Sequence, residues 1–388
     1  MTNGPLSFHW FLPTQGDGRG LIETGGTGPT GVAGGLRDPS LSYLGRIATA
    51  AEDLGFEAAL TPTGGWCDDA WVVTAMLSQL SERLKFLIAF RPGLISPTLA
   101  AQMAATFQWH SGGRLLLNVV TGGDSGEQRA LGDFLAKDDR YRRTGEFLEV
   151  VRRLWGGEKV DFDGAHLRIE GAQIHRLPDP APGIYFGGSS PIAGEIAASQ
   201  ADVYLTWGEP PQAVAEKVEW VAGLAAERGR ELRFGVRLHV ISRDHAADAW
   251  AEAERLLATV DEETIAKVQA RLRESESVGQ RRMLDLHGGS AARLEVAPNL
   301  WAGVGLGRGG AGTALVGSHE EVADRIEEYA AAGIQEFVLS GYPHLEELYW
   351  FGEGVLPLLR ERGLCSEPPT ALESGREGTA VPFAVGAR

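Results

Sequence analysis

Two basic side chains stand two residues apart in a short apolar run: Arg237 and His239 in FGVRLHV, at 234–240. If this run is a strand, both side chains point to the same face. The arginine fork matches the geometry of a planar oxyanion, so the pair predicts a site for a small anion. The alternative is a structural ion pair in the interior of the protein.

A third basic residue, Arg308, lies in the glycine-rich stretch GLGRGGAG at 305–312. Flexible flanks suit a loop that closes over a site and brings one charge to a bound anion. A solvated arginine is the alternative. A different anion site is predicted at 187–190, where GGSS precedes a helix, because free N–H groups at a helix start bind phosphate. An ordinary turn with a serine cap is the alternative there.

The sequence holds two cysteines, Cys67 and Cys365. Cys67 could act as a nucleophile with His344 as its base. However, Asp68 and Asp69 follow it directly and would raise the pKa of the thiol, so we expect a packed or pocket-wall thiol instead. Trp207, at the end of a predicted strand, can line a pocket. No group of His, Asp or Glu has the spacing of a metal site.

Eight strands, separated mainly by helices, must position these residues. The apolar runs predict strands at 7–13, 58–62, 84–90, 115–121, 184–186, 203–207, 234–242 and 336–340. The 3.6-residue periodicity predicts helices at 40–56, 69–80, 96–110, 140–155, 191–200, 210–229, 318–332 and 344–362. This alternation is typical of a (β/α)8 TIM barrel, whose chemistry lies on the loops after the strands. A doubly wound open sheet is the alternative, but no G-x-G-x-x-G follows the first strand.

Two segments interrupt the alternation. Residues 159–176 alternate in polarity around Asp163–Gly164 and predict an inserted hairpin. Residues 245–312 contain two consecutive helical patterns, 245–260 and 262–276, and then a long irregular stretch, so we expect a mobile lid segment here. We therefore predict one barrel domain over 1–363, followed by a disordered tail at 364–388.

Composition excludes several classes of partner. The chain has 388 residues, with 36 basic and 52 acidic side chains, so the formal net charge is −16. An acidic protein is a poor ligand for nucleic acid or an anionic membrane. The N-terminus has no signal-peptide pattern and no apolar run could span a bilayer, so we expect a cytoplasmic protein. The 52 glycines cluster after the predicted strands, where backbone must pass close to a ligand.

The loop sequences resemble the bacterial luciferase-like superfamily, and within it the FMNH2-dependent alkanesulfonate monooxygenases. The resemblance covers about residues 8–360. It is carried by WFLPT (10–14), CDDAW (67–71), VTGGD (120–124), YFGGSS (185–190), YLTWGEPP (204–211), FGVRLHV (234–240), DEETIAKVQA (261–270), NLWAGVGL (299–306) and FVLSGYPHLEE (337–347). Many of these matches are long and lie in predicted loops, which makes them specific.

The resemblance implies a two-component monooxygenase that uses reduced FMN and O2 to cleave the C–S bond of an organosulfonate, giving sulfite and an aldehyde. It implies an NAD(P)H-dependent FMN reductase as partner and a homo-oligomer, dimer or tetramer. By motif it assigns catalytic roles to Cys67, Arg237, His239, Arg308, Tyr342 and His344. It places Trp207, Arg237, His239 and Arg308 at the sulfonate, and Asn118, Thr121, Tyr141, Gly188, Ser189 and Ser190 at the flavin.

Two positions depart from the family pattern. Gln15 stands where the family has histidine after WFLPT, and a glutamine can hydrogen-bond but cannot titrate near neutrality. The residue before Cys67 is the bulky Trp66. Both changes touch the expected substrate pocket, so a hydroxylated substrate such as the sulfosugar sulfoquinovose is an alternative to a linear alkanesulfonate. A deazaflavin-dependent oxidoreductase and a non-catalytic flavin or sulfonate binding protein are further alternatives.

Overall fold

Eight parallel strands form a closed barrel. The computed structural model describes residues 4–21 and 37–366. The barrel strands are β1 (Ser7–Phe11), β2 (Ala58–Thr61), β3 (Lys85–Phe90), β4 (Leu115–Val119), β7 (Gly183–Phe186), β8 (Val203–Trp207), β9 (Arg233–Arg243) and β13 (Glu336–Ser340). Each pairs with its neighbour in that order, and β13 pairs with β1 to close the ring. This confirms the predicted (β/α)8 barrel and excludes the open sheet.

Alternate residues of each strand face the helices or the barrel interior, as the two-residue period of a strand requires. On β9, Val236 and Leu238 join the large core under the helices, so that Arg237 and His239 between them point inward. Phe11, on β1, belongs to the smaller interior cluster. The predicted common face of Arg237 and His239 therefore lies inside the barrel.

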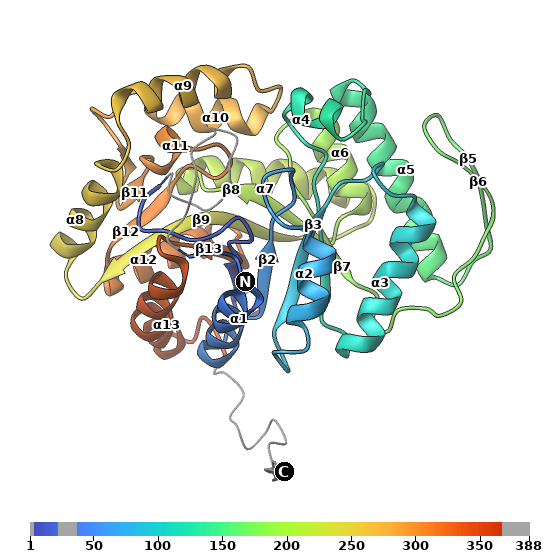
Figure 1. Cartoon of the computed structure of the whole chain (residues 1–388), viewed down its shortest axis with the longest axis horizontal. Helices are drawn as coiled ribbons and strands as arrows, with labels where there is room; N and C mark the ends of the chain where they lie inside the picture. The colour runs from blue at the N-terminus through green and yellow to red at the C-terminus, as the bar shows by residue number, and fades with distance from the viewer. Residues whose placement is uncertain (1–3, 22–36, 367–388) are drawn as a thin grey trace, which may run out of the picture.

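A layer of helices surrounds the strands (Figure 1). Its members are α1 (Leu41–Leu54), α2 (Ala70–Leu77), α3 (Pro97–Ser111), α5 (Lys137–Trp155), α6 (Pro191–Gln200), α7 (Pro211–Ala226), α12 (His319–Ala331) and α13 (His344–Glu361). Local sequence sets several of their ends. The side chains of Ser40, Asp69 and Ser96 each cap the first turn of a helix. The short helix α4 (Ser125–Ala130), after β4, was not predicted.

Two excursions leave the barrel (Figure 1). Strands β5 (Val160–Asp163) and β6 (Arg168–Ala172) form an antiparallel hairpin in the segment where a hairpin is predicted. The second excursion, which we call the insertion, comprises residues 245–312. It contains α8 (Ala246–Leu257), α9 (Glu262–Arg273), α10 (Val278–His287), β10 (Glu295–Ala297), β11 (Leu300–Trp301) and α11 (Val304–Gly307).

The expectation that residues 277–312 are irregular is wrong for its first third. Ser277 caps α10 by accepting a hydrogen bond from the backbone of Gln280, and Gly288 ends the helix in the left-handed conformation. The helix has only ten residues, which is too short for its periodicity to stand out beside the glycines that follow. Strand β12 (Ala314–Ser318), which pairs in parallel with the outer half of β9, was also not predicted.

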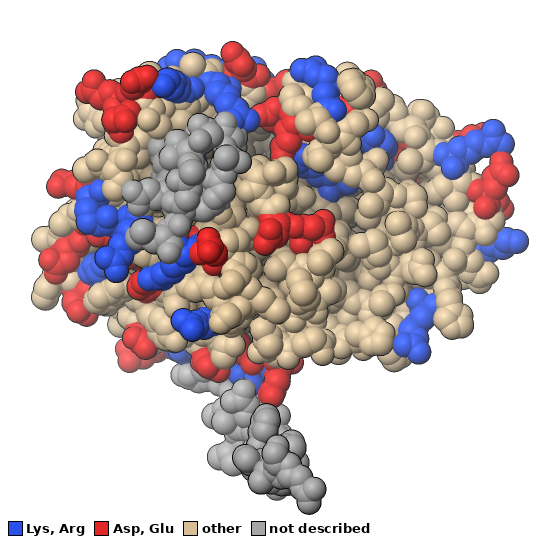
Figure 2. Space-filling view, viewed as in Figure 1, with Lys and Arg blue, Asp and Glu red and all other residues tan. Residues whose placement is uncertain are grey.

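The surface carries both signs of charge. On the described part of the face in Figure 2, acidic and basic side chains are interspersed, in keeping with the moderate excess of acidic residues. Within residues 4–21 and 37–366, no helix is long and apolar enough to cross a membrane. No group of three or more His, Cys, Asp or Glu side chains in those ranges could hold a metal ion. The predicted disordered tail lies, except for residues 364–366, outside the described residues.

Candidate functional site

Five of the predicted site residues meet at the carboxyl ends of β9 and β13: Arg237, His239, Arg308, Tyr342 and His344. We call them the anion cluster. The guanidinium of Arg237 lies over the ring of Phe11, 5.1 Å from its centroid. The rings of His239 and Tyr342 stack at 5.4 Å, and the ring of His344 meets that of Tyr342 edge-on at 5.2 Å.

A hydrogen-bond relay through Ser340 sets the protonation of His239. Nη2 of Arg237 donates to Oγ of Ser340 at 2.8 Å, and Oγ of Ser340 lies 2.7 Å from Nδ1 of His239. Nε2 of His239 lies 3.1 Å from the carbonyl of Ala311, which can only accept. The ring therefore carries its proton on Nε2 and accepts from Ser340 on Nδ1. Burial, together with the charges of Arg237 and Arg308, holds the pKa of His239 well below its ordinary value, so this ring is neutral.

Arg308 reaches the same cluster from the insertion, where it donates a hydrogen bond to the hydroxyl of Tyr342. Among the described residues, neither Arg308 nor Arg237 forms an ion pair with a carboxylate. Burial and the nearby charge of Arg308 lower the pKa of Arg237 to about 9, which leaves it charged at neutral pH. Two partly or wholly buried cations without a counter-ion form a site that a small anion would neutralise.

His344, the first residue of α13, is held by Asp17. Nδ1 of His344 lies 2.9 Å from Oδ1 of Asp17, and the backbone N–H of His344 donates to both carboxylate oxygens, at 3.1 and 2.9 Å. Both side chains are fully buried. Asp17 follows β1, and the turn that positions it contains Gly16 at a φ of 103°, a conformation that favours glycine.

Most of the residues predicted to bind the flavin gather around the start of α6, across the barrel mouth from the anion cluster. Hydroxyl groups of Thr121 and Ser190 lie beside the phenol of Tyr141; burial raises the pKa of that phenol and the two hydroxyls oppose the rise. A Cβ on Gly188 would lie 2.6 Å from Cβ of Ala193 and 3.1 Å from the Tyr141 oxygen. Only glycine therefore allows the chain to pass here.

The start of α6 suits a phosphate. Ser190 occupies its N-cap position, and its side chain makes no capping hydrogen bond. Pro191 at the first helical position has no N–H, so the N–H groups of the two residues after it are left available. The hydroxyl of Tyr204 donates to the carbonyl of Gly188 at 2.7 Å and fixes the preceding turn. The residues present thus fit the phosphate end of a flavin nucleotide. Ser189, half-buried in this turn, lies beside Tyr204.

Four other predicted site residues stand apart from both groups, namely Asn118, Trp207, Gln15 and Cys67. Asn118 points inward from β4, since its neighbours Leu117 and Val119 join the core under the helices. Trp207 ends β8 and lies against α10, where a Cβ on Gly279 would be 3.3 Å from its ring. Gln15 is buried, and its Oε1 has no hydrogen-bond partner in the described ranges.

Cys67 makes a poor nucleophile in this setting. Its Sγ lies 3.6 Å from the carbonyl of Gly64, and burial, with Asp68 and Glu127 nearby, raises the pKa of the thiol to about 12. The thiol therefore stays protonated at neutral pH, as the sequence argument expects. Any contribution of Cys67 would be that of a neutral pocket-wall side chain.

Ion pairs hold the insertion against the barrel mouth. Arg140 on α5 pairs with Glu276 at 3.1 Å, and Arg271 on α9 pairs with Asp124 at 2.9 Å. Nε of Arg282, on α10, lies 2.5 Å from Glu209 after β8. The backbone of Glu276 also donates to the carbonyl of Gly123. The insertion therefore covers the loops that follow β4 and β8 in this structure, while its mobility stays a prediction.

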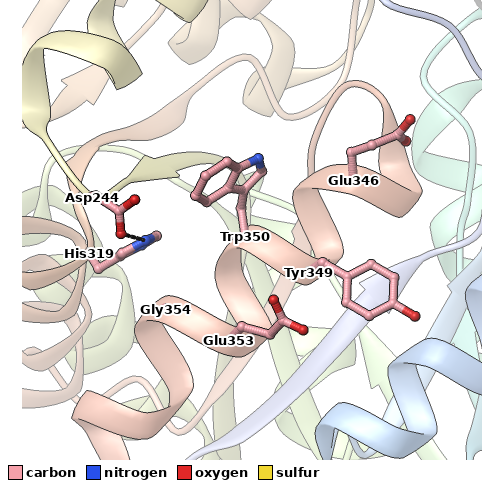
Figure 3. A pocket seen from close by; sticks show the side chains of 7 residues that line it. All are labelled: Asp244, His319, Glu346, Tyr349, Trp350, Glu353 and Gly354. Carbon is pink, nitrogen blue, oxygen red and sulfur yellow. Dashed lines mark ion pairs between the residues drawn. The ribbon is translucent and has the colours of Figure 1, made fainter.

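An open groove of about 550 Å³ lies elsewhere, along the outer side of α13 (Figure 3). Its lining is Asp244, His319, Glu346, Tyr349, Trp350, Glu353 and Gly354. Nε2 of His319 faces Asp244 at 3.6 Å, and Glu346 pairs with Arg37. None of the predicted site residues lines this groove, and we place the site at the barrel mouth instead.

Sequence reasoning missed three residues that shape the site: Asp17, Tyr204 and Ser340. Asp17 and Ser340 lie 327 and 101 positions from the histidines they contact, and Tyr204 lies 16 positions from Gly188 on the next strand, so no local spacing could reveal these contacts. Asp17 and Ser340 do lie at predicted strand ends, which was the available signal. The spacing of Arg237 and His239 predicted two basic side chains on one face. It could not predict the Ser340 hydroxyl that links them, because that residue lies on another strand.

Comparison with known proteins gives a consistent result. The sequence profile of the luciferase-like monooxygenase family matches residues 6–336. A riboflavin lyase, solved with modified FMN and riboflavin, superposes with a TM-score of 0.78 at 22% identity, covering 93% of each chain. The EDTA monooxygenase from Chelativorans sp. BNC1 gives 0.72 at 18% identity, covering 93% of this chain and 95% of that one. An F420-dependent secondary alcohol dehydrogenase gives 0.67 at 18%, covering 92% and 99%.

Proposed function

Since this chain belongs to the luciferase-like monooxygenase family, we propose that it is a two-component monooxygenase that uses reduced FMN and O2 to cleave the C–S bond of an organosulfonate. Sulfite and an aldehyde are the proposed products. The observation that carries the substrate class is the pair Arg237 and Arg308 in the anion cluster, two arginines that have no carboxylate partner among the described residues. A sulfonate is permanently anionic and presents three oxygens, which suits convergent guanidinium donors.

The flavin phosphate would be held at the start of α6 by Ser189, Ser190 and the Gly188 turn, with Tyr141 and Thr121 beside it. When bound, reduced FMN supplies the electrons that activate O2. This chain's own residues bind and orient the anion, exclude water and move protons. His239 is neutral and both of its nitrogens are engaged, so we assign it a donor and positioning role.

Arg308 also links the insertion to the anion cluster, because its side chain extends from the insertion. Its bond to Tyr342 forms only when the glycine-rich stretch lies against the barrel, so anion binding and closure are coupled through one side chain. Closure excludes water, which strengthens every charge interaction in the site. We assign proton exchange with the bound anion to Tyr342 and His344, whose rings meet edge-on within the anion cluster.

The proposed reaction needs a source of reduced flavin, and we propose an NAD(P)H-dependent FMN reductase. We also propose a homo-oligomer, dimer or tetramer. Exposed apolar side chains on α2 and α3 support this, namely Val72, Met76, Leu99 and Trp109. Analytical ultracentrifugation would measure the assembly.

A sulfosugar such as sulfoquinovose is a second candidate substrate. Gln15 favours it, because its buried Oε1 lacks a partner among the described residues and could accept a hydrogen bond from a substrate hydroxyl. A linear alkanesulfonate offers no such donor. The two candidates share the anion cluster and differ only at this side of the pocket.

Sulfite release tests the proposal. The protein is incubated with FMN, a flavin reductase, NAD(P)H and O2, against a panel of linear alkanesulfonates, methanesulfonate and sulfoquinovose. We expect sulfite from at least one member, and only when all components are present. No sulfite from any member would overturn the proposal, and tighter binding of a deazaflavin than of FMN would favour a deazaflavin-dependent oxidoreductase. Flavin binding without oxygen-dependent turnover would indicate a binding protein.

A further inference from the structure

His344 has one committed nitrogen and one free nitrogen. Its Nδ1 lies 2.9 Å from Oδ1 of Asp17. An ionised carboxylate can only accept, so the hydrogen of the neutral ring is on Nδ1. Nε2 is buried and has no hydrogen-bond partner in the part of the chain that the structure describes. The neutral ring therefore keeps a lone pair on Nε2, inside the protein.

Asp17 is itself surrounded by donors. Its carboxylate accepts from the backbone N–H groups of Gly18, at 2.9 Å, and of His344, and from the hydroxyl of Tyr43. Burial alone would raise the pKa of Asp17, but attraction to the protonated form of His344 and the hydrogen bonds from His344 and Tyr43 outweigh it and hold the pKa below its ordinary value. The carboxylate is therefore ionised at neutral pH and ready to stabilise positive charge on the ring.

A closed set of contacts fixes this carboxylate in space. Arg37 donates to the hydroxyl of Tyr43 at 3.0 Å and to Glu346 at 2.7 Å, two residues beyond His344. The backbones of Arg37 and Asp17 pair with each other, at 3.0 and 3.1 Å. The contacts thus run from α13 through Arg37 and Tyr43 to Asp17 and back to α13, which leaves the imidazole little freedom to turn.

The fixed ring lies in the anion cluster. It meets the edge of Tyr342, whose hydroxyl binds Arg308, and its centroid is 5.6 Å from that of Phe11, the ring under Arg237. A histidine whose Nδ1 is held by a buried carboxylate and whose Nε2 is free is arranged as a general base.

We propose that Asp17 is the positioning residue for His344: it fixes the tautomer and orientation of the ring so that Nε2 exchanges a proton with the bound substrate. This inference rests on the proposed function. During turnover, Nε2 takes one proton and the ring becomes an imidazolium that Asp17 stabilises. The same nitrogen later releases one proton, which restores the neutral ring, so the cycle requires no further reactant and Asp17 stays ionised throughout.

The variant Asp17→Asn tests this role, because it keeps the size of the side chain and removes its charge. We expect kcat for sulfite release to fall by about 10²- to 10⁴-fold, the usual contribution of general acid–base catalysis, with little change in KM. The pH profile of kcat should also move towards lower pH, since a neutral amide no longer stabilises an imidazolium. Tyr43→Phe, which removes one donor to Asp17, should shift the profile in the same direction by less.

Glu52→Gln is the matched control. Glu52, near the end of α1, is another buried carboxylate that accepts backbone N–H bonds. Its donors are residues 82, 83 and 84, which directly precede β3 and so lie at the opposite end of the barrel. It should lower stability without moving the pH profile. A pH profile in Asp17→Asn that matches wild type would overturn the proposal, whatever the change in kcat.

A second readout separates this inference from the proposed function. In spectra of protein labelled with ¹⁵N-histidine, assigned by comparison with His344→Gln, His344 should carry its proton on Nδ1 in wild type and lose that preference in Asp17→Asn. This measurement needs neither flavin nor sulfonate. A proton on Nε2 of wild-type His344 would overturn the positioning role even if sulfite is produced. The expected tautomer in a protein that releases no sulfite would instead count against the proposed function alone.

Discussion

Charged side chains occupy the barrel interior at both ends. At one end a buried carboxylate has cationic partners, and at the other end two arginines lack a carboxylate partner within the part of the chain that the structure describes. At the amino-terminal ends of the strands, Glu336 is fully buried and lies 3.0 Å from His9, 3.0 Å from Arg233 and within hydrogen-bond distance of Tyr185. At the carboxyl ends, Arg237 and Arg308 have no carboxylate partner among the described residues, and burial with mutual repulsion lowers the pKa of Arg237 to about 9.

The two ends of β9 and β13 therefore differ in their expected roles, with the paired charges stabilising the fold and those at the carboxyl ends binding the ligand. Arg233 and Arg237 are four residues apart on β9, and Glu336 and Ser340 are four apart on β13. Removing one partner of a buried ion pair strongly destabilises the fold, whereas a buried charge that has no partner is stabilised only when a ligand supplies the missing charge. We therefore expect the amino-terminal cluster to control folding and the anion cluster to control binding.

The largest expected effect comes from removing the charge at the amino-terminal end. Glu336→Gln keeps the shape of the side chain but leaves His9 and Arg233 without their carboxylate, and should lower the free energy of unfolding by about 3–5 kcal/mol. Urea denaturation measures this. Glu158→Gln, which breaks an exposed ion pair with Arg153, is the control and should cost less than about 1 kcal/mol. If both variants lowered the free energy of unfolding by a similar amount, the ion pairs of Glu336 would stabilise the fold no more than an exposed pair does.

The pH dependence of this effect has a defined sign. Burial would raise the pKa of Glu336, but the bond from His9, the charges of His9 and Arg233 and the bond from Tyr185 hold it below its ordinary value. Its contribution is therefore present above the unfolded pKa of about 4.3 and is lost as the pH falls through the folded pKa. The stability difference between wild type and Glu336→Gln should narrow below about pH 4.

Breaking the other cluster should affect catalysis and leave the fold intact. Arg308→Ala removes the charge that the insertion brings to the anion, and should lower kcat for sulfite release by about 10²- to 10³-fold, as loss of a preorganised donor does. The urea midpoint should not fall, because among the described residues no carboxylate is left unpaired and the repulsion between Arg308 and Arg237 is removed. Arg281→Ala, exposed on α10 of the same insertion, is the control. Turnover at the wild-type rate would remove Arg308 from the mechanism.

Adding a single methyl group to the turn before α6 should weaken FMN binding. In Gly188→Ala the new Cβ meets Ala193 and Tyr141, so the turn before α6 must shift, at a cost of about 1–3 kcal/mol. We expect weaker FMN binding, measured by isothermal titration. Gly223→Ala on α7 has open space around its Cβ and should leave FMN binding unchanged. Equal affinity in the two variants would argue against a phosphate at this turn.

The smallest expected effect is the pH dependence of substrate binding. Because the pKa of Arg237 is lowered to about 9, the free protein loses this charge above that pH, and sulfonate affinity should then fall by up to about tenfold per pH unit. Below about pH 8 the affinity should be flat with respect to this group. Tryptophan fluorescence can follow binding. In Arg237→Met the fall above pH 9 should disappear, and its persistence there would assign it to another group.

The sequence was sufficient for the barrel and for the common face of Arg237 and His239, because both follow from local periodicity. It could not reveal the contacts that set their protonation. Ser340 bonds to His239 from 101 positions away, and Asp17 to His344 from 327. Such partners are brought together by closure of the barrel, and a single sequence carries no trace of them.

Two secondary-structure elements in and beside the insertion, α10 and β12, also could not be predicted from the sequence. The pattern of α8 and α9 was clear, whereas α10 follows within a few residues and precedes a glycine-rich stretch that dominates the local composition. The short strand β12 closely follows Gly309, Gly310 and Gly312, so its start cannot be told from that stretch. Both elements are stabilised by packing against the rest of the molecule rather than by strong local preference.

Strand β9 continues beyond the barrel to Arg243. Its outer part pairs with β12, from His239, which also pairs with Ser340 of β13, to Arg243, which pairs with Ser318. The chain thus leaves for the insertion and returns from it along one short parallel ribbon outside the eight-strand ring. Lengthening a loop between fixed ends adds only a logarithmic entropy cost. The intervening segment can therefore be exchanged for one of different length or sequence without reopening the barrel. A chimera that keeps both strands of this ribbon is accordingly the natural unit for redirecting the enzyme to new substrates.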